Sequence, residues 1–284
     1  MLFRSANGYL WNLAQRAGLS FRNYGEFVMP DGGRGQVPRG YLGNKPFLRS
    51  HTNYDYPAFD LNIPDQKRAD IWLGDLARFV GRSEMPKLQV IRLPNDHTSG
   101  GRAGAPSPSA QVADNDLALG RIVEGLSKSP FWRSTLVAVV EDDAQNGSDH
   151  VDSHRSVLLL ISAWNRAGVY HRFTNTTDVI ATIERALGLG SLSQFDHFGR
   201  PVTDIFASAP DLRPYAALTP SVNLAERNPS GTRDARESAQ LDLRFEDMAD
   251  EAQFNRILWR MIKGGTRPYP GAQRMSTLEY ARTR

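Results

Sequence analysis

Two continuous apolar runs constrain the fold of this chain most strongly. STLVAVV (134–140) and VLLLISAW (157–164) show no alternation of polar and apolar residues, a pattern typical of strands buried on both faces of a sheet. Segments with helical periodicity, such as 65–80 and 110–126, alternate with the strand candidates along the chain. Strands that alternate with helices predict an α/β fold with a mostly parallel sheet and helices on both faces.

The remaining expected elements fit the same alternation. Pro30 to Pro64 is rich in Gly and Pro, which predicts long surface connections. Thr176 or Thr177 is expected to cap a helix that ends at Gly188. The elements expected besides those above are helices at 7–17 and 177–187 and strands at 19–28 and 87–94.

Three regions are expected along the chain. Residues 1–210 form the α/β domain, and residues 211–245 are polar and interrupted by Gly and Pro, as in a linker or loop. Residues 246–284 contain a helix that is acidic at its start and ends in Lys263 and Gly264, as the helix dipole and C-cap favour. Its apolar face is expected to dock on the domain through Phe254, Ile257, Leu258 and Met261.

Composition excludes several classes of function. The 34 Lys and Arg against 31 Asp and Glu give a net charge of only +3, without a basic stripe interleaved with aromatic residues, so nucleic acid is not an expected partner. No apolar run is long enough for a membrane segment, and the N-terminus lacks a secretory signal. The chain has no cysteine, so any metal must bind through Asp, Glu, His, Asn or backbone oxygen.

Polar side chains cluster directly after two of the expected strands. Asp96 and His97 follow the strand at 87–94, and Glu141, Asp142 and Asp143 follow the strand at 134–140. Ligands of parallel α/β sheets bind beyond the carboxyl ends of the strands. We therefore expect the two loops to converge on one crevice.

The second cluster has the chemistry of a cation site. Adjacent carboxylates repel one another, and a divalent cation relieves that repulsion. His150 and His154 follow within the same loop, and mixed oxygen and nitrogen donors suit Mn²⁺, Zn²⁺, Mg²⁺ or Ca²⁺. The alternative is that DDAQNGSDH is a solvated loop with Asn-Gly as its turn.

Two arginines are candidates for binding an anion. Arg102 lies in the loop TSGGRAGAP, whose backbone amides could cradle an oxyanion, although no Gly-Lys-Ser/Thr follows as in a P-loop. Arg155 follows His154 and is either a phosphate partner or the ion partner of Asp152.

The segment VVEDDAQNGSDHVDSHRSVLLLIS resembles bacterial phosphoesterases of the alkaline phosphatase superfamily, in the branch related to phospholipase C and acid phosphatases. Asp142 and Asp143 stand at the family's acidic pair, with Asp143 in place of Glu, and the later Asp-His-Val triplet is matched at 149–151. LPNDHTSG resembles the upstream histidine motif of the family at Asp96 and His97. The likeness covers most of residues 7–270.

The resemblance implies an alkaline phosphatase-like doubly wound sheet and metal-assisted hydrolysis of phosphate esters. It implies His97 and His150 as catalytic residues and a divalent metal held by Asp96, Asp142, Asp143 and His154. Arg102 and Arg155 are the candidates for phosphate binding. The family's first strand and its Ser or Thr nucleophile have no match, so the fold is expected to be N-terminally incomplete, with oligomerisation or a missing N-terminal portion as consequences.

Two other classes of function remain open. A degenerate relative would bind metal or ligand without turnover, because no nucleophile is identified. A sulfatase or phosphomutase-like activity would use the same metal cradle, and fold likeness cannot choose among these chemistries. Relatives are often exported, whereas this chain shows no export signal, so the sequence does not predict a compartment.

Overall fold

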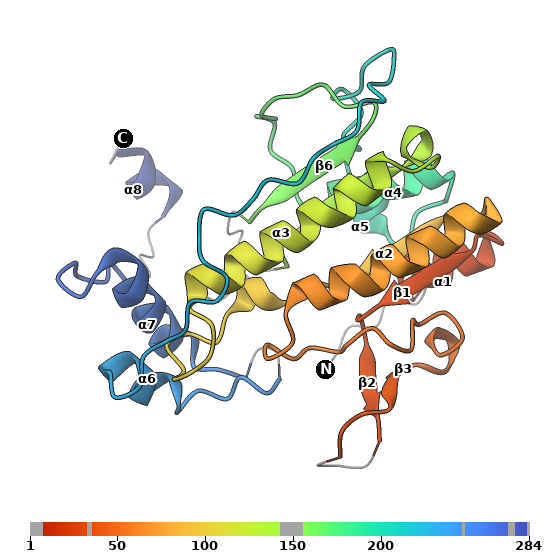
Figure 1. Cartoon of the computed structure of the whole chain (residues 1–284). Coiled ribbons are helices and arrows are strands. Elements are labelled where there is room, and N and C mark those ends of the chain that lie inside the picture. Colours follow the sequence, from red (N-terminus) through yellow and green to blue (C-terminus); the bar gives the residue numbers. More distant parts are fainter. Residues whose placement is uncertain (1–7, 33–35, 143–155, 246–247, 272–275, 283–284) are drawn as a thin grey trace. The chain divides into compact units, whose positions relative to one another are not determined.

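The computed structural model describes residues 8–32, 36–142, 156–245, 248–271 and 276–282 (Figure 1). The chain forms two compact units that are interleaved along the sequence. Unit 1 consists of Met1–Asn95, Asp114–Val139 and Leu158–Thr219, and unit 2 consists of Asp96–Ala113, Val140–Val157 and Pro220–Arg284. The candidate residues Asp143, His150, His154 and Arg155 lie outside the described residues.

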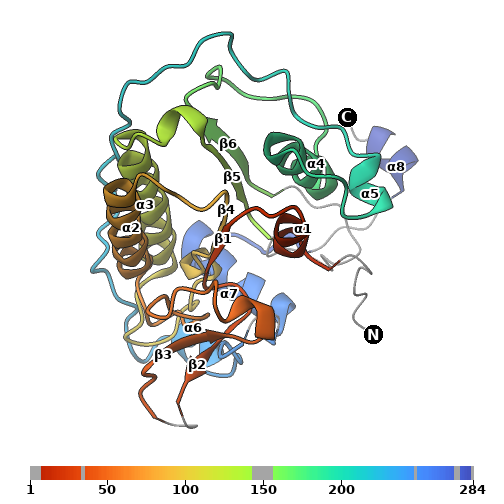
Figure 2. The same ribbon diagram turned by 90° about the vertical axis from the view of Figure 1, so that its right-hand side faces the viewer.

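Unit 1 is a mixed α/β structure. Strand β1 (Phe21–Tyr24) pairs in parallel with β4 (Leu88–Ile91), and β5 (Leu136–Val140) is hydrogen-bonded to β6 (Leu158–Ser162). Figure 2 shows helices on both sides of these strands, with α2 and α3 on one side and α1 and α4 on the other. The expected α/β class agrees with this arrangement.

Strands β5 and β6 are less buried than their sequences predict. Val140 and Leu159 each keep 42% of their surface exposed, and the remaining residues of both strands are only half-buried. The expectation of strands buried on both faces was therefore wrong. Apolar β-branched runs report strand propensity as well as burial, and the sequence alone does not separate the two contributions.

The core of unit 1 lies mainly between two long helices, α2 (Asp65–Arg82) and α3 (Pro108–Ser127). Trp72 of α2 is only 2% exposed. A Cβ atom at Gly125 of α3 would lie 2.4 Å from Leu73 Cδ2, so glycine permits the close approach of the two helices. Burial of a large apolar side chain contributes roughly 1.5–3 kcal/mol, which makes this contact a major source of stability.

A second apolar cluster surrounds helix α1 (Leu10–Arg16). Trp11 and Ala14 of this helix are buried together with Phe21, Leu48 and Leu88. The predicted helix at 7–17 and strand at 19–28 are confirmed in their central residues, where the periodic apolar side chains meet this cluster.

The segment from Pro30 to Pro64 contains more structure than its composition predicts. Strands β2 (Val28–Asp31) and β3 (Gly40–Gly43) form an antiparallel pair, and the 3-10 turn η1 (Pro46–Leu48) follows. Tyr56 is fully buried. Four-residue strands that contain Gly and Pro carry no periodic signal, so the sequence predicted only surface connections here.

Helix α4 (Thr176–Leu187) begins one residue earlier than expected and has a different cap. Asn175 Oδ1 accepts the N–H of Asp178 at 3.0 Å, whereas Thr177 Oγ1 donates to Asn175 Oδ1 at 2.7 Å. Gly188 ends the helix at φ +67°, as predicted, because glycine adopts the left-handed conformation without a Cβ clash. The short helix α5 (Gln194–His197) follows.

Unit 2 contains helices α6 (Arg233–Ser238), α7 (Glu251–Lys263) and α8 (Thr277–Arg282). Helix α6 lies within 211–245, the stretch expected to be a linker or loop. In α7, Phe254 and Ile257 are buried, and Leu258 and Met261 are half-buried, as the apolar periodicity predicts. Among the described residues, no helix is both long and apolar enough to cross a membrane.

Two 3-10 turns complete the elements. One is η2 (Asn95–His97), which follows β4, and the other is η3 (Trp132–Ser134), which precedes β5. The turn η2 carries the Asp96 and His97 pair.

Candidate functional site

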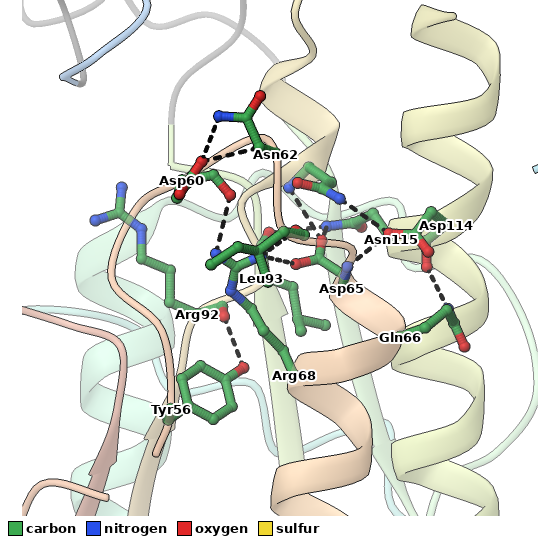
Figure 3. A network of polar contacts seen from close by, with 12 residues as sticks. Tyr56, Asp60, Asn62, Asp65, Gln66, Arg68, Arg92, Leu93, Asp114 and Asn115 are labelled. Atoms are coloured by element: carbon green, nitrogen blue, oxygen red, sulfur yellow. Dashed lines mark hydrogen bonds and ion pairs between the residues drawn. The ribbon is translucent and has the colours of Figure 1, made fainter. Parts of the chain in front are cut away.

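A buried polar network in unit 1 holds the chain just before Asp96 (Figure 3). Its centre is Asp65, which has no exposed surface and stands at the first position of α2. The Asp65 carboxylate accepts three hydrogen bonds of 3.0 Å, from the Asn95 backbone N–H, Asn115 Nδ2 and Arg68 Nη1. These contacts join the end of β4 to helices α2 and α3.

Arg68 is the cation of this network and is also fully buried. Besides Asp65, its guanidinium donates to the carbonyl oxygens of Ile63 at 2.7 Å and Ala58 at 2.8 Å. Burial raises the pKa of Asp65 to about 6, and the positive charge of Arg68 acts against this increase. The pair is therefore a structural ion pair whose charges depend on their hydrogen bonds.

Asp114 of α3 supplies the second carboxylate. Asp114 Oδ2 accepts the Asp65 N–H at 2.6 Å and Asn95 Nδ2 at 2.9 Å. Asn95 is thus fixed through both its backbone and its side chain, and Asn115 Nδ2 also donates to the Leu93 carbonyl at 2.8 Å. Asn95 Oδ1 is buried and has no hydrogen-bond partner among the described residues. The last residues before Asp96 therefore have one fixed conformation.

In unit 2, the loop that follows His97 is held by buried hydrogen bonds. Thr98 adopts a left-handed conformation with φ +61°, which is strained for a β-branched residue. The Ser99 N–H donates to Gln111 Oε1 at 2.7 Å, and the Gly101 N–H donates to Ser238 Oγ at 2.8 Å. Strained backbone persists only where its surroundings fix it, and such positions often occur at functional sites.

Asn228 fixes the same loop from another part of unit 2. Its Nδ2 donates to the carbonyl oxygens of Gly100 at 2.8 Å, Arg102 at 3.1 Å and Pro106 at 3.2 Å. The Asn228 side chain is thereby committed to backbone carbonyls, of which that of Arg102 also accepts the Ala105 N–H at 3.1 Å. The segment from Asn223 to Gln240, which the sequence predicts as a linker or mobile loop, thus supplies a structural side chain.

His97 is half-buried and packs against helix α7. The ring centroids of His97 and Phe254 are 5.7 Å apart, and His97 Nδ1 lies 3.5 Å from the Thr98 carbonyl oxygen. Packing against an apolar ring limits the orientations of the imidazole. The structure thus gives a fixed environment to the histidine that the sequence predicts as catalytic.

The loops after β4 and β5 belong to the same unit, and their carboxyl groups influence each other. The pKa of Asp96 is raised. The larger cause is partial loss of solvation of its carboxyl group, and the second cause is the negative charge of Glu141. Glu141 is anchored to the start of β6: its N–H donates to the Val157 carbonyl at 3.0 Å, and its Oε2 accepts the Val157 N–H at 3.1 Å. The two loops thus belong to one unit, whereas the expected crevice between them stays a prediction.

The structure describes two of the other predicted site residues, and both are exposed. Asp142 is exposed just after β5, and the Arg102 side chain is exposed. In the part of the chain that the structure describes, no group of three or more His, Asp or Glu side chains lies close enough to hold a metal ion. Of the predicted metal ligands, the described Asp96 and Asp142 carry carboxylate oxygens, the donor type that hard divalent cations take.

Sequence reasoning missed the residues that support this region. Asn95 immediately precedes Asp96 in LPNDHT, and Asp114 and Asn115 lie on the helix that follows the loop. Their signal was the polarity of ADND within an otherwise apolar helix, where unpaired polar groups are costly to bury. Asp65 and Arg68 at i and i+3 carried a similar signal at the start of α2.

Comparisons with known proteins do not identify a family: neither the protein-family models nor the curated proteins contain a match to this chain.

Proposed function

We propose that this chain is a metal-dependent hydrolase of phosphate esters with an alkaline phosphatase-like, doubly wound fold. One observation carries the proposal: the loops after β4 and β5, with Asp96 and Glu141, belong to one compact unit. The resemblance of the same two loops to phosphoesterase motifs supports it.

The proposal assigns the metal to carboxylates and a histidine. Asp96, Asp142, Asp143 and His154 would hold a divalent ion, of which Mn²⁺, Zn²⁺, Mg²⁺ and Ca²⁺ are the candidates. When bound, such an ion polarises phosphoryl oxygens and lowers the pKa of water. The Glu141 carboxylate accepts the Val157 N–H and so fixes the start of the loop after β5. Its negative charge would complement the charge of the cation.

The chain's own residues would orient the ester and move protons. His97 and His150 exchange a proton with the reacting group, and the packing of His97 on Phe254 fixes its ring for that transfer. Arg102 and Arg155 bind the anionic oxygens of the substrate. A loop fixed at Ser99, Gly101 and Asn228 keeps such groups in place without reorganisation.

A non-catalytic role is the main alternative. No nucleophile is assigned, so a cradle that binds a metal or a phosphate without turnover would use the same carboxylates. A sulfatase or phosphomutase-like activity is a further alternative within the same resemblance.

The test measures hydrolysis of a chromogenic phosphate monoester, a phosphodiester and a sulfate ester. The chain is first treated with a chelator and then supplied with each of the four metals in turn. Wild type is compared with Asp96→Asn and Asp142→Asn, and with Asp116→Asn as an exposed Asp-to-Asn control on α3. We expect metal-dependent cleavage of a phosphate ester that both site variants reduce at least about 100-fold, as for groups essential to transition-state stabilisation.

The unfolding temperature with and without metal separates the alternatives. A metal-induced increase without cleavage of any ester would favour the non-catalytic cradle and contradict the proposal. Cleavage of the sulfate ester alone would favour the sulfatase alternative. Full activity in both site variants would exclude these carboxylates as the site.

A further inference from the structure

Unit 1 exposes phenylalanine side chains on two neighbouring segments, 166–173 and 195–204, which we call the Phe–Arg surface. Phe173 is 66% exposed, Phe195 is 68% exposed and Phe198 is 80% exposed. Phe195 and Phe198 are spaced i and i+3 at helix α5, so they share one side of that turn. Contiguous exposed apolar patches mark interaction sites more often than single exposed apolar side chains do.

Direct contacts join the two segments into one surface. Arg172 Nη2 donates to the carbonyl oxygens of Arg200 and Pro201, both at 3.3 Å, and Arg200 Nη2 donates to the Phe173 carbonyl at 3.1 Å. The Arg200 guanidinium also lies 6.0 Å from the centroid of the Phe173 ring. The arginines are therefore held beside the exposed aromatic side chains.

The fold exposes more arginines than acids in this region, although its sequence contains equal numbers of both. Residues 166–204 contain four arginines and four acidic residues. All four arginines are exposed, whereas three of the acids are buried and only Asp204 is exposed. The buried acids have partners within the fold: Asp178 takes part in the capping of α4 and lies 3.6 Å from Arg200 Nη2, and both Glu184 and Asp196 accept the Leu192 N–H. The exposed charged side chains are therefore four arginines, of which Arg200 is paired with Asp178, and one aspartate, Asp204.

We propose that the Phe–Arg surface docks on membranes that contain anionic phospholipids. Arginines near a membrane surface are attracted by anionic headgroups, and phenylalanine side chains gain free energy when they enter the boundary between headgroups and acyl chains. Phenyl rings without a polar tip gain more from lipid than from an aqueous polyanion. This docking is peripheral, needs no membrane-spanning helix and does not depend on the proposed hydrolase activity.

The test is flotation of the full chain with vesicles of phosphatidylcholine, alone or mixed with phosphatidylglycerol. The test variant is the double substitution Phe195→Gln and Phe198→Gln. The control is Leu212→Gln with Leu218→Gln, two exposed apolar residues of the same unit outside the Phe–Arg surface. We expect binding to the mixed vesicles only, weakened at least about tenfold in the test variant and unchanged in the control, because two phenylalanines lose their lipid contact.

Three results would overturn the proposal. The first is no binding to anionic vesicles at low ionic strength, and the second is equal binding by wild type and the test variant. The third is tighter binding to single-stranded nucleic acid than to vesicles, lost in the same variant, which would make the surface a nucleic-acid site. Gel filtration of wild type and the test variant tests whether a second copy of the chain covers the Phe–Arg surface. A wild-type dimer that the test variant abolishes, without vesicle binding, would also contradict membrane docking.

Discussion

Substitution of Arg68 by methionine tests whether the buried network stabilises unit 1. Helix α2 provides a matched comparison, because Asp65–Arg68 and Asp75–Arg78 are both ion pairs at i and i+3. The Arg68 side chain is 0% exposed and the Arg78 side chain is 59% exposed. Methionine preserves the aliphatic part of either arginine and removes the charge and the hydrogen bonds.

The two substitutions should differ by several kcal/mol. Arg68→Met leaves the buried Asp65 without its cation and removes the donor to the Ile63 and Ala58 carbonyls, a loss of about 3–5 kcal/mol for a broken buried pair. Arg78→Met should cost about 1 kcal/mol or less, because the Arg78 side chain is exposed and the buried Asp75 keeps a second cation, Arg22 Nη2, at 3.4 Å. Asp75 also keeps the hydrogen bonds from Tyr24 and Asn53, both at 2.8 Å.

The assay is urea and thermal unfolding followed by tryptophan fluorescence at pH 5 and pH 8. At about 2–4 °C per kcal/mol for a protein of similar size, Arg68→Met should lower the unfolding temperature by on the order of 10 °C. Burial already raises the pKa of Asp65 from 3.8 to about 6, and loss of Arg68 raises it further. An acid with a raised folded-state pKa loses stability as pH increases, so the penalty should be larger at pH 8 than at pH 5.

Equal penalties for Arg68→Met and Arg78→Met would refute this reasoning, because burial would then not control the strength of the pairs. A penalty for Arg68→Met that is smaller at pH 8 than at pH 5 would contradict the direction of the Asp65 pKa shift.

Two further predictions concern other buried polar groups. Burial, with the charge of Asp196 as a further cause, raises the pKa of Glu184 to about 7 from 4.5, so the wild type should lose stability as pH rises through this range. Glu184→Gln should remove that loss. In urea unfolding, the stability of the variant relative to wild type should increase by on the order of 1 kcal/mol from pH 5 to pH 8, whereas the exposed control Glu84→Gln should show no such increase. An unchanged pH dependence of stability in Glu184→Gln would exclude Glu184 as its cause. Asn228→Ala should destabilise unit 2 by about 1–3 kcal/mol, because the Gly100 and Pro106 carbonyls lose their side-chain donor and the Arg102 carbonyl keeps only the Ala105 N–H. The exposed control Asn223→Ala should cost less. Hydrogen exchange at Gly100 and Gly101 that remains as slow as in wild type would count against this role.

Long periodic elements of this fold could be predicted from the sequence. The helix at 65–80 and the strand at 87–94 agree with α2 and β4 because their apolar spacing reflects the face that they bury. The β2–β3 pair was missed because its four-residue strands contain Pro30, Gly40 and Gly43. The pair is held by hydrogen bonds between its strands and by contacts with Leu48 and Tyr54, which local periodicity does not contain.

The candidate site was predictable only in part. The adjacency of Asp96 and His97 and the position of Glu141 after β5 were visible in the sequence, because strand ends mark the functional edge of an α/β sheet. The support from Asn95, Asp65 and Asp114 was not visible, since each hydrogen bond joins residues that are separated by 19 or more positions. The half-exposure of β5 was also hidden, because the same apolar run suits a buried or an exposed strand.

The interleaving of the two units has a consequence for synthesis of the chain. Unit 1 takes its segments from Met1–Asn95, Asp114–Val139 and Leu158–Thr219, with pieces of unit 2 between them. During synthesis on the ribosome, unit 1 therefore cannot be complete until Thr219 has been translated and has left the ribosome. A single cut cannot separate the units as independent fragments, so a fragment that ends within residues 114–219 should expose apolar surface and bind chaperones.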